Sequence, residues 1–271
     1  MKFGIVYPTY SEYVNKKLVE KVARKAEEND FEYFFVSDHY MTSDTSVWFE
    51  SWSLLSYLAA ITTKIKLGTC VTPIPFRNPA QLAKIVANVD ILSEGRVILG
   101  VGAGWSREEF EGYSKWEKAS ERVSMTEEGV RLILELWQKN EVNFEGKYYR
   151  FKRAILEPKP IQNPHPPLWF GAFGNRMLKI TSKYGDGWIP GQIESDIYAC
   201  LKNKIKTQKS NFCYAYELFI PYKTQKDYID IIEKFKEKGC EHFTIKWLYE
   251  PQEMVERIKW FKENVISVFS K

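Results

Sequence analysis

Residues 66–105, KLGTCVTPIPFRNPAQLAKIVANVDILSEGRVILGVGAGW, contain a strand pattern, a helix pattern and a second strand pattern in succession. The runs Lys66–Val71 and Val97–Val101 are short and rich in apolar residues, which is typical of buried strands. The longer segment between them, Pro79–Leu92, is expected to be a helix. Two strands joined by a helix run parallel, so this stretch predicts the βαβ unit of an α/β protein.

The same alternation continues in both directions along the chain. Further strands are expected at Lys2–Tyr7, Tyr33–Ser37, Pro167–Gly171, Gly187–Pro190, Cys213–Ile220 and Glu241–Lys246. Further helices are expected at Lys16–Glu28, Phe49–Thr62, Ser106–Glu111 continuing with Ala119–Gln138, Arg176–Tyr184, Ser195–Lys209, Gln225–Lys238 and Glu253–Val265. Eight strand–helix pairs predict a TIM (β/α)8 barrel. An open doubly wound sheet is the alternative, because alternation alone does not show closure.

One connection, residues 140–166, departs from the pattern. Val142–Phe151 predicts a hairpin around Glu145-Gly146, and closely spaced prolines follow as far as Pro166, where a helix cannot persist. We expect an excursion before the fifth strand that forms a lid or wall over the site. No boundary is drawn there, so residues 1–271 are expected to form a single barrel domain.

Composition excludes several classes of protein. The 271 residues are 44% hydrophobic, which allows a large core, and their net charge of +4 is diluted over the whole length. The basic stretch Lys202–Lys209 has no interleaved aromatic residues, which argues against a nucleic-acid partner. No apolar run approaches the ~18 residues of a membrane span, and residues 1–10 contain a strand pattern instead of a signal peptide. We therefore expect a cytoplasmic protein without a membrane partner.

Cysteine and histidine are too sparse to predict a metal site or a disulfide. The chain has four cysteines and three histidines, and no two cysteines form a C-x-x-C pair. The cysteines are Cys70, Cys200, Cys213 and Cys240, and the histidines are His39, His165 and His242. No metal is expected, and the sequence leaves open whether Cys70 is reactive, with a buried thiol as the default.

The active site of a parallel barrel forms at the carboxyl ends of its strands, so the residues there are the candidates. Asp38 and His39 end the second strand, where a carboxylate and an imidazole would suit hydride chemistry. The alternative is an Asp that caps the next element beside a packed His.

Gly100, Gly102 and Gly104 end the fourth strand. Their missing side chains let a flat ring or a phosphate approach, or simply shape the barrel corner. Their spacing does not match a dinucleotide-binding fingerprint.

A small-residue loop, Gly171-Ala172-Phe173-Gly174-Asn175-Arg176, ends the fifth strand and leads into a helix. Free backbone N–H groups at a helix start can bind a phosphate, with Arg176 in the first turn, although such loops also occur only to make the turn. Aromatic side chains near the strand ends would build a flat apolar slot or simply pack in the core. They are Tyr7, Trp105, Phe173 and Trp188.

Short motifs distributed as far as Pro190 together carry a family resemblance. They are Val36-Ser37-Asp38-His39, Lys66-Leu67-Gly68-Thr69-Cys70-Val71, Phe76-Arg77-Asn78-Pro79-Ala80-Gln81-Leu82-Ala83-Lys84, Leu92-Ser93-Glu94-Gly95-Arg96-Val97, Leu99-Gly100-Val101-Gly102-Ala103-Gly104-Trp105 with Phe110, Arg122, Pro158-Lys159-Pro160 before Pro166-Pro167, and Tyr184-Gly185-Asp186-Gly187-Trp188. In order and spacing the chain resembles the bacterial luciferase-like family, whose members are flavin monooxygenases and oxidoreductases that use the deazaflavin coenzyme F420. The ends of strands two and four are more similar to the F420-dependent branch.

The resemblance implies a homodimer of TIM-type barrels and a site for the cofactor. It implies a non-proline cis peptide at Cys70–Val71, behind the cofactor ring. It places Asp38 and His39 beside the ring as catalytic and binding residues, and Gly102, Gly104 and Trp105 along the cofactor. It makes Gly171, Ala172, Phe173, Gly174, Asn175 and Arg176 the phosphate-binding segment. Trp105 stands near the position of a proton-donating glutamate in sugar-phosphate relatives, which argues against such a substrate, and Glu12 lies near a second family glutamate.

Cofactor identity decides the reaction, because a deazaflavin transfers hydride at a carbon whereas a flavin can also activate oxygen. The leading hypothesis is an F420-dependent oxidoreductase that transfers hydride between the deazaflavin and a small organic substrate. The alternative is an FMN-dependent monooxygenase or a flavin reductase-coupled oxidoreductase. A cofactor-binding protein without activity is the third hypothesis.

Overall fold

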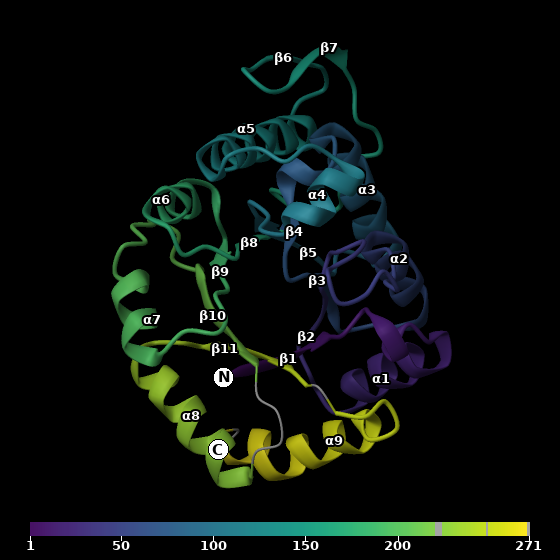
Figure 1. Cartoon of the computed structure of the whole chain (residues 1–271), viewed down its shortest axis with the longest axis vertical. Helices are drawn as coiled ribbons and strands as arrows, with labels where there is room; N and C mark the ends of the chain where they lie inside the picture. Colours follow the sequence, from purple (N-terminus) through teal and green to yellow (C-terminus); the bar gives the residue numbers. More distant parts are fainter. Residues whose placement is uncertain (220–223, 248, 270–271) are drawn as a thin grey trace.

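The computed structural model describes residues 1–219, 224–247 and 249–269, and within them eight parallel strands form a closed ring (Figure 1). The strands are β1 (Lys2–Tyr7), β2 (Tyr33–Val36), β3 (Lys66–Thr69), β5 (Val97–Gly102), β8 (Leu168–Phe170), β9 (Gly187–Trp188), β10 (Cys213–Phe219) and β11 (His242–Lys246). Neighbouring strands pair in the order β3, β2, β1, β11, β10, β9, β8, β5, and β3 pairs with β5 to close the ring. The barrel prediction is confirmed and the open doubly wound sheet is wrong. Ile220, expected at the end of β10, lies outside the described residues.

Helices surround the barrel because each buries one apolar face against the strands (Figure 1). They are α1 (Lys16–Glu28), α2 (Ser51–Ile61), α3 (Pro79–Leu92), α4 (Arg107–Tyr113), α5 (Ala119–Gln138), α6 (Asn175–Tyr184), α7 (Ser195–Lys202), α8 (Gln225–Glu237) and α9 (Met254–Phe261). In α1 the side chain of Asn15 caps the first turn by accepting the N–H of Leu18, and Val19, Val22 and Ala23 are buried. No helix in the described ranges combines the length and apolar character needed to traverse a bilayer.

Two helices end four or more residues before their predicted ends. Helix α7 ends at Lys202 instead of Lys209, because the chain turns to run beside α6: the N–H of Lys206 donates to Ser182 Oγ, and Lys209 Nζ lies 2.7 Å from Asp186 Oδ1. Helix α9 ends at Phe261 and continues as a π-helix over Lys262–Ile266, so the last four residues of the predicted helix, as far as Val265, are π-helical.

The barrel interior is built from every second residue of each strand. On β2 these positions include Tyr33 and Phe35, which belong to a buried cluster with Ile98, Trp169 and Ala215. The remaining strand residues point outward and pack with the helices in a larger apolar core. Side chains therefore fill the interior at the amino end of the strands. A site can form only at the carboxyl end.

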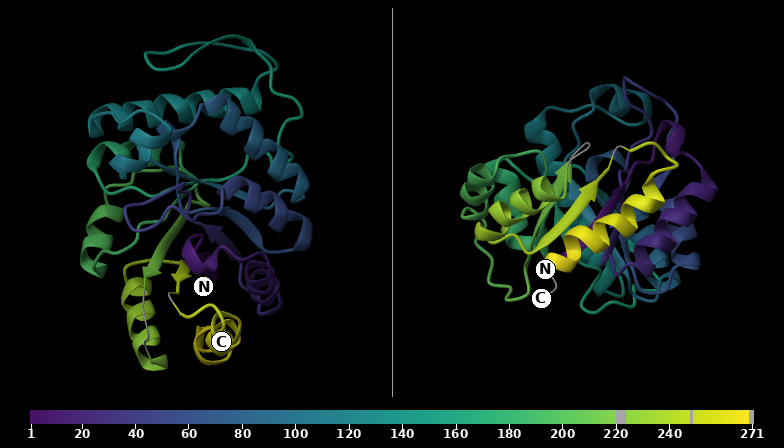
Figure 2. Two further views of the ribbon diagram at one scale, coloured as in Figure 1. Left: turned by 45° about the vertical axis from the view of Figure 1, so that its right-hand side comes forward. Right: turned by 90° about the horizontal axis from the view of Figure 1, so that it is seen from below.

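Residues 140–166 form the excursion that was predicted, but they do not cover the site. Strands β6 (Val142–Glu145) and β7 (Arg150–Ala154) make an antiparallel hairpin outside the barrel, beyond α5 (Figures 1 and 2). After the hairpin the chain returns past the amino end of the barrel strands, where Asp90 accepts the N–H groups of Ile161 and Gln162. None of these residues lines the cavity described below, so the prediction of a lid or wall is wrong. Glu128 on α5 holds the hairpin turn instead, by accepting three backbone N–H groups.

Candidate active site

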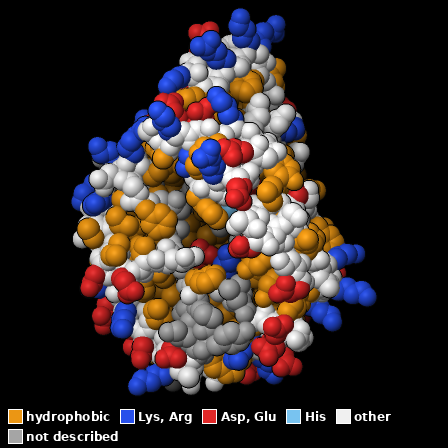
Figure 3. Space-filling view, viewed as in Figure 1, with side chains coloured by type: hydrophobic (Ala, Val, Ile, Leu, Met, Phe, Trp, Pro, Cys, Tyr) orange, Lys and Arg blue, Asp and Glu red, His pale blue; other side chains and the backbone are white. Residues whose placement is uncertain are grey.

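A cavity of about 830 Å³ opens at the carboxyl ends of the barrel strands. The molecule is hollowed at the centre of this face, and hydrophobic side chains surround the opening (Figure 3). The residues that line it are Ser37, His39, Cys70, Val71, Pro73, Gly102, Ala103, Gly104, Trp105, Val123, Gly171, Ala172, Phe173, Gly174, Met177, Ile189, Gly191, Gln192, Ile193, Glu217 and Lys246. The site therefore forms where the fold predicts it.

A bulge in the third barrel strand forms part of the cavity wall. Strand β3 ends at Thr69, the Cys70–Val71 peptide bond is cis, and the short strand β4 (Thr72–Pro73) resumes pairing with β5. The cis bond confirms the expectation from the family resemblance. Cys70 and Val71 both line the cavity, and burial raises the pKa of the Cys70 thiol well above its usual value, which disfavours the reactive thiolate.

Three glycines at and just beyond the end of β5 are closely packed by the bulge and its neighbours, and two of them, Gly102 and Gly104, also line the cavity. A Cβ on Gly100 would overlap the carbonyl oxygen of Thr69, and one on Gly102 would lie 2.7 Å from Val71 Cγ2. Gly104 has φ +80°, and its Cβ would lie 2.5 Å from the ring of Phe110. Close packing thus explains why these positions are glycine, which favours the barrel-corner alternative over the approach of a ligand as the reason for them.

His39 is held at the cavity edge by a glutamate that the sequence analysis missed. His39 Nδ1 lies 2.9 Å from Glu109 Oε2, and Glu109 Oε1 accepts the N–H of Tyr40 at 2.6 Å. Glu109 lies on α4 and is 1% exposed, whereas His39 lines the cavity. A carboxylate on Nδ1 favours the tautomer with its proton on that nitrogen, which leaves Nε2 free to exchange a proton. The pair spans 70 residues in sequence, so no local motif indicated it.

Asp38 does not line the cavity, unlike its neighbour His39. Its carboxylate is buried and accepts two hydrogen bonds from Arg77, Nη1 to Oδ2 at 2.9 Å and Nη2 to Oδ1 at 2.7 Å. Thr72, just beyond the bulge, donates to Asp38 Oδ2 at 2.6 Å. Adjacent residues at a strand end point in opposite directions, which explains why only one of the two reaches the cavity. Asp38 is thus placed to fix the bulge. Glu12, the other acidic candidate, is exposed and does not line the cavity.

The loop from Gly171 to Gly174 lines the cavity, but the next two residues do not. Gly174 precedes the first residue of α6, no side chain caps this helix, and a Cβ on Gly174 would meet no atom within 4 Å. Asn175 and Arg176 are exposed, and Arg176 donates to the carbonyl of Ser120 and to Ser124 on α5. The first turn of α6 is thus left without a side-chain cap, and the guanidinium of Arg176, which was predicted to help bind a phosphate, is engaged by α5.

The aromatic slot forms from two of the four residues predicted for it. Trp105 and Phe173 line the cavity and are 69% and 48% exposed. Tyr7 and Trp188 are fully buried core residues outside the lining. Trp188 supports the loop from below by donating from Nε1 to the carbonyl of Ala172 at 2.8 Å.

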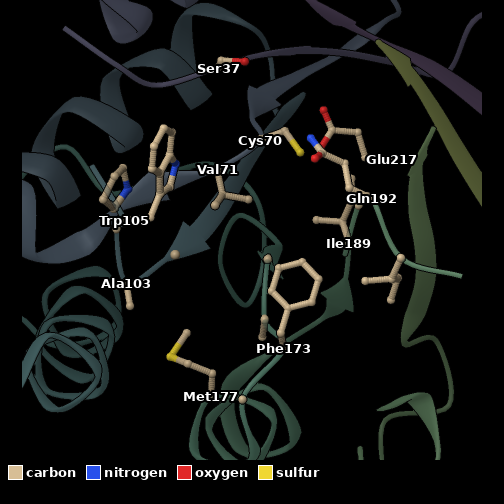
Figure 4. A pocket seen from close by; sticks show the side chains of 18 of the residues that line it. Ser37, Cys70, Val71, Ala103, Trp105, Phe173, Met177, Ile189, Gln192 and Glu217 are labelled. Carbon is tan, nitrogen blue, oxygen red and sulfur yellow. The ribbon is translucent and has the colours of Figure 1, made fainter. Parts of the chain in front are cut away.

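A polar wall was also missed by the sequence analysis, and two of its members, Gln192 and Glu217, lie across the cavity from Trp105 (Figure 4). It consists of Ser37, Gln192, Glu217 and Lys246, which come from the ends of four barrel strands. The alternation Cys213, Ala215, Glu217 on β10 and His242, Thr244, Lys246 on β11 would have placed both charged residues inward at the strand ends. That signal is present in the sequence alone. No cluster of three metal-binding side chains occurs in residues 1–219, 224–247 and 249–269.

Solved structures with the same fold cover nearly the whole chain. An F420-dependent secondary alcohol dehydrogenase in complex with an F420–acetone adduct superposes with a TM-score of 0.84, 22% identity and 98% coverage of each chain. The coenzyme F420-dependent tetrahydromethanopterin reductase from Methanopyrus kandleri gives a TM-score of 0.82, 19% identity and 99% coverage of each chain. At these identities the likeness shows the fold.

Two curated relatives match part of the chain in sequence. A phthiodiolone/phenolphthiodiolone dimycocerosates ketoreductase of Mycobacterium bovis is 37% identical over 146 residues, which are 52% of this chain and 37% of the relative. An F420-dependent glucose-6-phosphate dehydrogenase of Amycolatopsis mediterranei is 33% identical over 187 residues, 68% of this chain and 56% of the relative. The matched region thus spans well under two thirds of each relative.

The sequence model of the luciferase-like monooxygenase family matches residues 1–210, about three quarters of the chain. That region contains the Cys70–Val71 bulge, His39 with Glu109, and the loop before α6. The chain belongs to the luciferase-like monooxygenase family.

Proposed function

We propose that this protein is an F420-dependent oxidoreductase that transfers hydride between the deazaflavin and a small organic substrate. The observation that carries the proposal is one cavity that combines a bulged, apolar wall for a flat ring with an imidazole held at its edge by Glu109. F420 as the cofactor is supported by the names of relatives, both the glucose-6-phosphate dehydrogenase and the solved structures with the same fold.

The residues present fit a deazaflavin nucleotide. Val71 and Ile189 offer apolar contacts to a planar ring, and 830 Å³ lies within the usual range for a pocket that holds an organic ligand. The uncapped start of α6 offers backbone N–H groups to a phosphate, and the open space beside Gly174 leaves room for it. When bound, the deazaflavin supplies a carbon that accepts or donates hydride.

His39 is proposed as the catalytic residue that moves the proton. Its Nε2 would take the hydroxyl proton of an alcohol as hydride leaves, or give a proton to a carbonyl oxygen as hydride arrives. Glu109 acts through His39 as a positioning residue, because it bonds the other ring nitrogen. Asp38 is proposed as a positioning residue for the bulge, through Thr72.

The lining favours a substrate without a phosphate group. Around the opening the side chains of Trp105, Phe173 and Met177 are apolar or aromatic. Among the described lining residues, Lys246 carries the one permanent positive charge, and its Nζ lies beside Ser37 Oγ on the polar wall. A phosphorylated sugar needs cationic side chains at the opening, so we propose an uncharged alcohol or carbonyl compound as substrate.

A cofactor titration tests the proposal. The purified protein is titrated with F420 and separately with FMN, and binding is followed by fluorescence. We expect F420 to bind more tightly and its absorbance to bleach with one alcohol from a panel of secondary alcohols. Preferential uptake of FMN, with oxygen-dependent turnover, would instead support the monooxygenase. The homodimer and the cytoplasmic location stay predictions, which light scattering and cell fractionation can test.

A further inference from the structure

The polar wall has charged groups that the hydride-transfer proposal does not use. Glu217 extends from β10 toward Cys70, and Gln192 extends beside it from the loop after β9 (Figure 4). Lys246 ends β11, and its Nζ lies 3.4 Å from Ser37 Oγ. Within the part of the chain that the structure describes, the Glu217 carboxylate has no hydrogen bond or ion pair. An acceptor and a cationic donor therefore face the cavity with most of their bonding capacity unused.

The place of Glu217 is fixed by its surroundings. A Cβ added at Gly191 would lie 2.9 Å from Glu217 Oε2, so the carboxylate lies directly against the Gly191 backbone. Burial raises the pKa of Glu217, and the positive charge of Lys246 opposes that rise. Burying a carboxyl group without a partner is costly, so such a group at a cavity wall indicates that a ligand completes its bonding.

We propose that Glu217 and Lys246 form the subsite for the imide edge of the cofactor ring, the C=O, N–H, C=O sequence of its pyrimidinedione. Glu217 accepts the hydrogen bond of the imide N–H, and Lys246 donates to an adjacent carbonyl oxygen. Ser37 and Gln192 flank the two charged groups and add a hydroxyl and an amide. The pattern of one acceptor beside donors complements an edge that presents one donor between two acceptors.

The location favours the cofactor over the substrate as the ligand of this pair. Glu217 and Lys246 act on the Cys70 thiol electrostatically, so they lie beside the bulge on which the ring would rest. The proton-transferring His39 and the exposed Trp105 are 5.5 Å apart, centroid to centroid, on the other side of the cavity. A flat ring that spans the cavity would extend from the side of His39 and Trp105 to the side of Glu217 and Lys246. Its imide edge would then lie at Glu217 and Lys246. Lys246 would then favour the electron-rich reduced ring, whose negative charge spreads to this edge.

The inference rests on the proposed ring site but not on F420 itself, because FMN has the same imide edge. The test measures dissociation constants by fluorescence titration for F420, for its deazaflavin riboside without the phosphate-bearing tail, and for FMN. The variants are Lys246→Met, Lys246→Gln and Glu217→Gln. Lys259→Met, on the exposed surface of α9, is the matched control.

We expect Lys246→Met to weaken F420 binding about ten- to a hundredfold, Glu217→Gln about three- to tenfold, and Lys246→Gln by an intermediate factor. Each factor should be the same for the riboside, because the tail is not involved, and Lys259→Met should bind as the wild type does. Circular dichroism confirms that the variants are folded.

Unchanged dissociation constants in folded Lys246→Met and Glu217→Gln proteins, with a raised KM for substrate, would overturn the inference and assign the pair to the substrate. Weakened binding of F420 but not of the riboside would also overturn it, by assigning the pair to the tail. If the wild type prefers FMN, the proposed function fails, whereas the subsite is supported as long as the variants weaken FMN binding by the same factors.

Discussion

The two ends of the barrel interior are built by the same strands but are filled differently. At the amino end, Tyr33, Trp169 and His242 pack against one another, with ring centroids 5.0 to 5.7 Å apart. At the carboxyl end the inward positions include Gly102, Gly171 and Gly191, and a cavity of about 830 Å³ remains. Side-chain size at successive inward positions thus decides which end is packed and which end can bind a ligand.

The polar groups at the two ends also differ in how they are satisfied. At the amino end the Tyr33 hydroxyl is 2.7 Å from His242 Nδ1, so each group has a buried partner. At the carboxyl end His39 has Glu109, whereas Glu217 has no partner within the described residues. Variants at the packed end should therefore change stability, and variants at the open end should change binding and turnover.

The largest expected effect is at the open end. Replacing His39 by Asn removes the proposed proton donor and acceptor, and we expect turnover to fall about 10²- to 10⁴-fold. The melting temperature and the dissociation constant of F420 should stay close to the wild-type values. Stopped-flow bleaching of F420 with the substrate found in the alcohol panel measures the effect. Full turnover in the variant would exclude His39 from catalysis.

At the packed end, Trp169→Ala should destabilise the protein by about 3–5 kcal/mol, because a buried ring leaves a cavity. Trp105→Ala, at the exposed opening, is the matched control and should change stability by less than about 0.5 kcal/mol. Urea unfolding of both variants measures the difference. Equal losses in the two variants would mean that the ends of the barrel do not differ as the structure indicates.

Protonation of His242 should destabilise the packed end at low pH. Burial, with a contribution from Lys2, lowers the pKa of His242 from 6.5 to about 4. The unfolded chain therefore takes up a proton between these values and the folded chain does not, so the folded state loses stability as pH falls from 6.5 to 4. Relative to neutral pH, the loss at pH 4 should approach about 3 kcal/mol.

The variant His242→Gln isolates this contribution, because it keeps an acceptor for Tyr33 and does not titrate. Urea unfolding between pH 4 and 7.5 should show a steeper decline in the free energy of unfolding for the wild type than for the variant. Parallel declines would mean that His242 is not kept neutral by burial.

The barrel itself could be predicted from sequence, because local periodicity and its repetition along the chain determine it. The strand ends then placed His39, Trp105 and the loop after Phe170 correctly in the cavity. Reading the last inward residues of β10 and β11 by the same rule would have added Glu217 and Lys246.

Contacts between distant segments could not be predicted in the same way. The choice of Glu109 over the adjacent Glu108 as the partner of His39 depends on the packing of α4, where Glu109 is buried and Glu108 is exposed. The orientation of Asp38 depends on Arg77, and the engagement of Arg176 depends on α5. The course of residues 140–166 depends on Glu128 and Asp90, which no motif connects to that segment.

The smallest expected effect is that of Gly174→Ala at the open end. We compare it with Gly100→Ala, because the two glycines have different surroundings. In Gly174→Ala the added methyl group meets open space and φ is −75°, so the cost is only that of a poorer helix cap, ~0.5 kcal/mol. In Gly100→Ala the methyl group overlaps the Thr69 carbonyl next to the bulge, so the strands must move apart and the cost should reach about 1–3 kcal/mol. Thermal unfolding ranks the two variants. If Gly100→Ala proved as mild as Gly174→Ala, the close packing of β5 against the bulge, and with it the rigid wall proposed for the cofactor ring, would have to be abandoned.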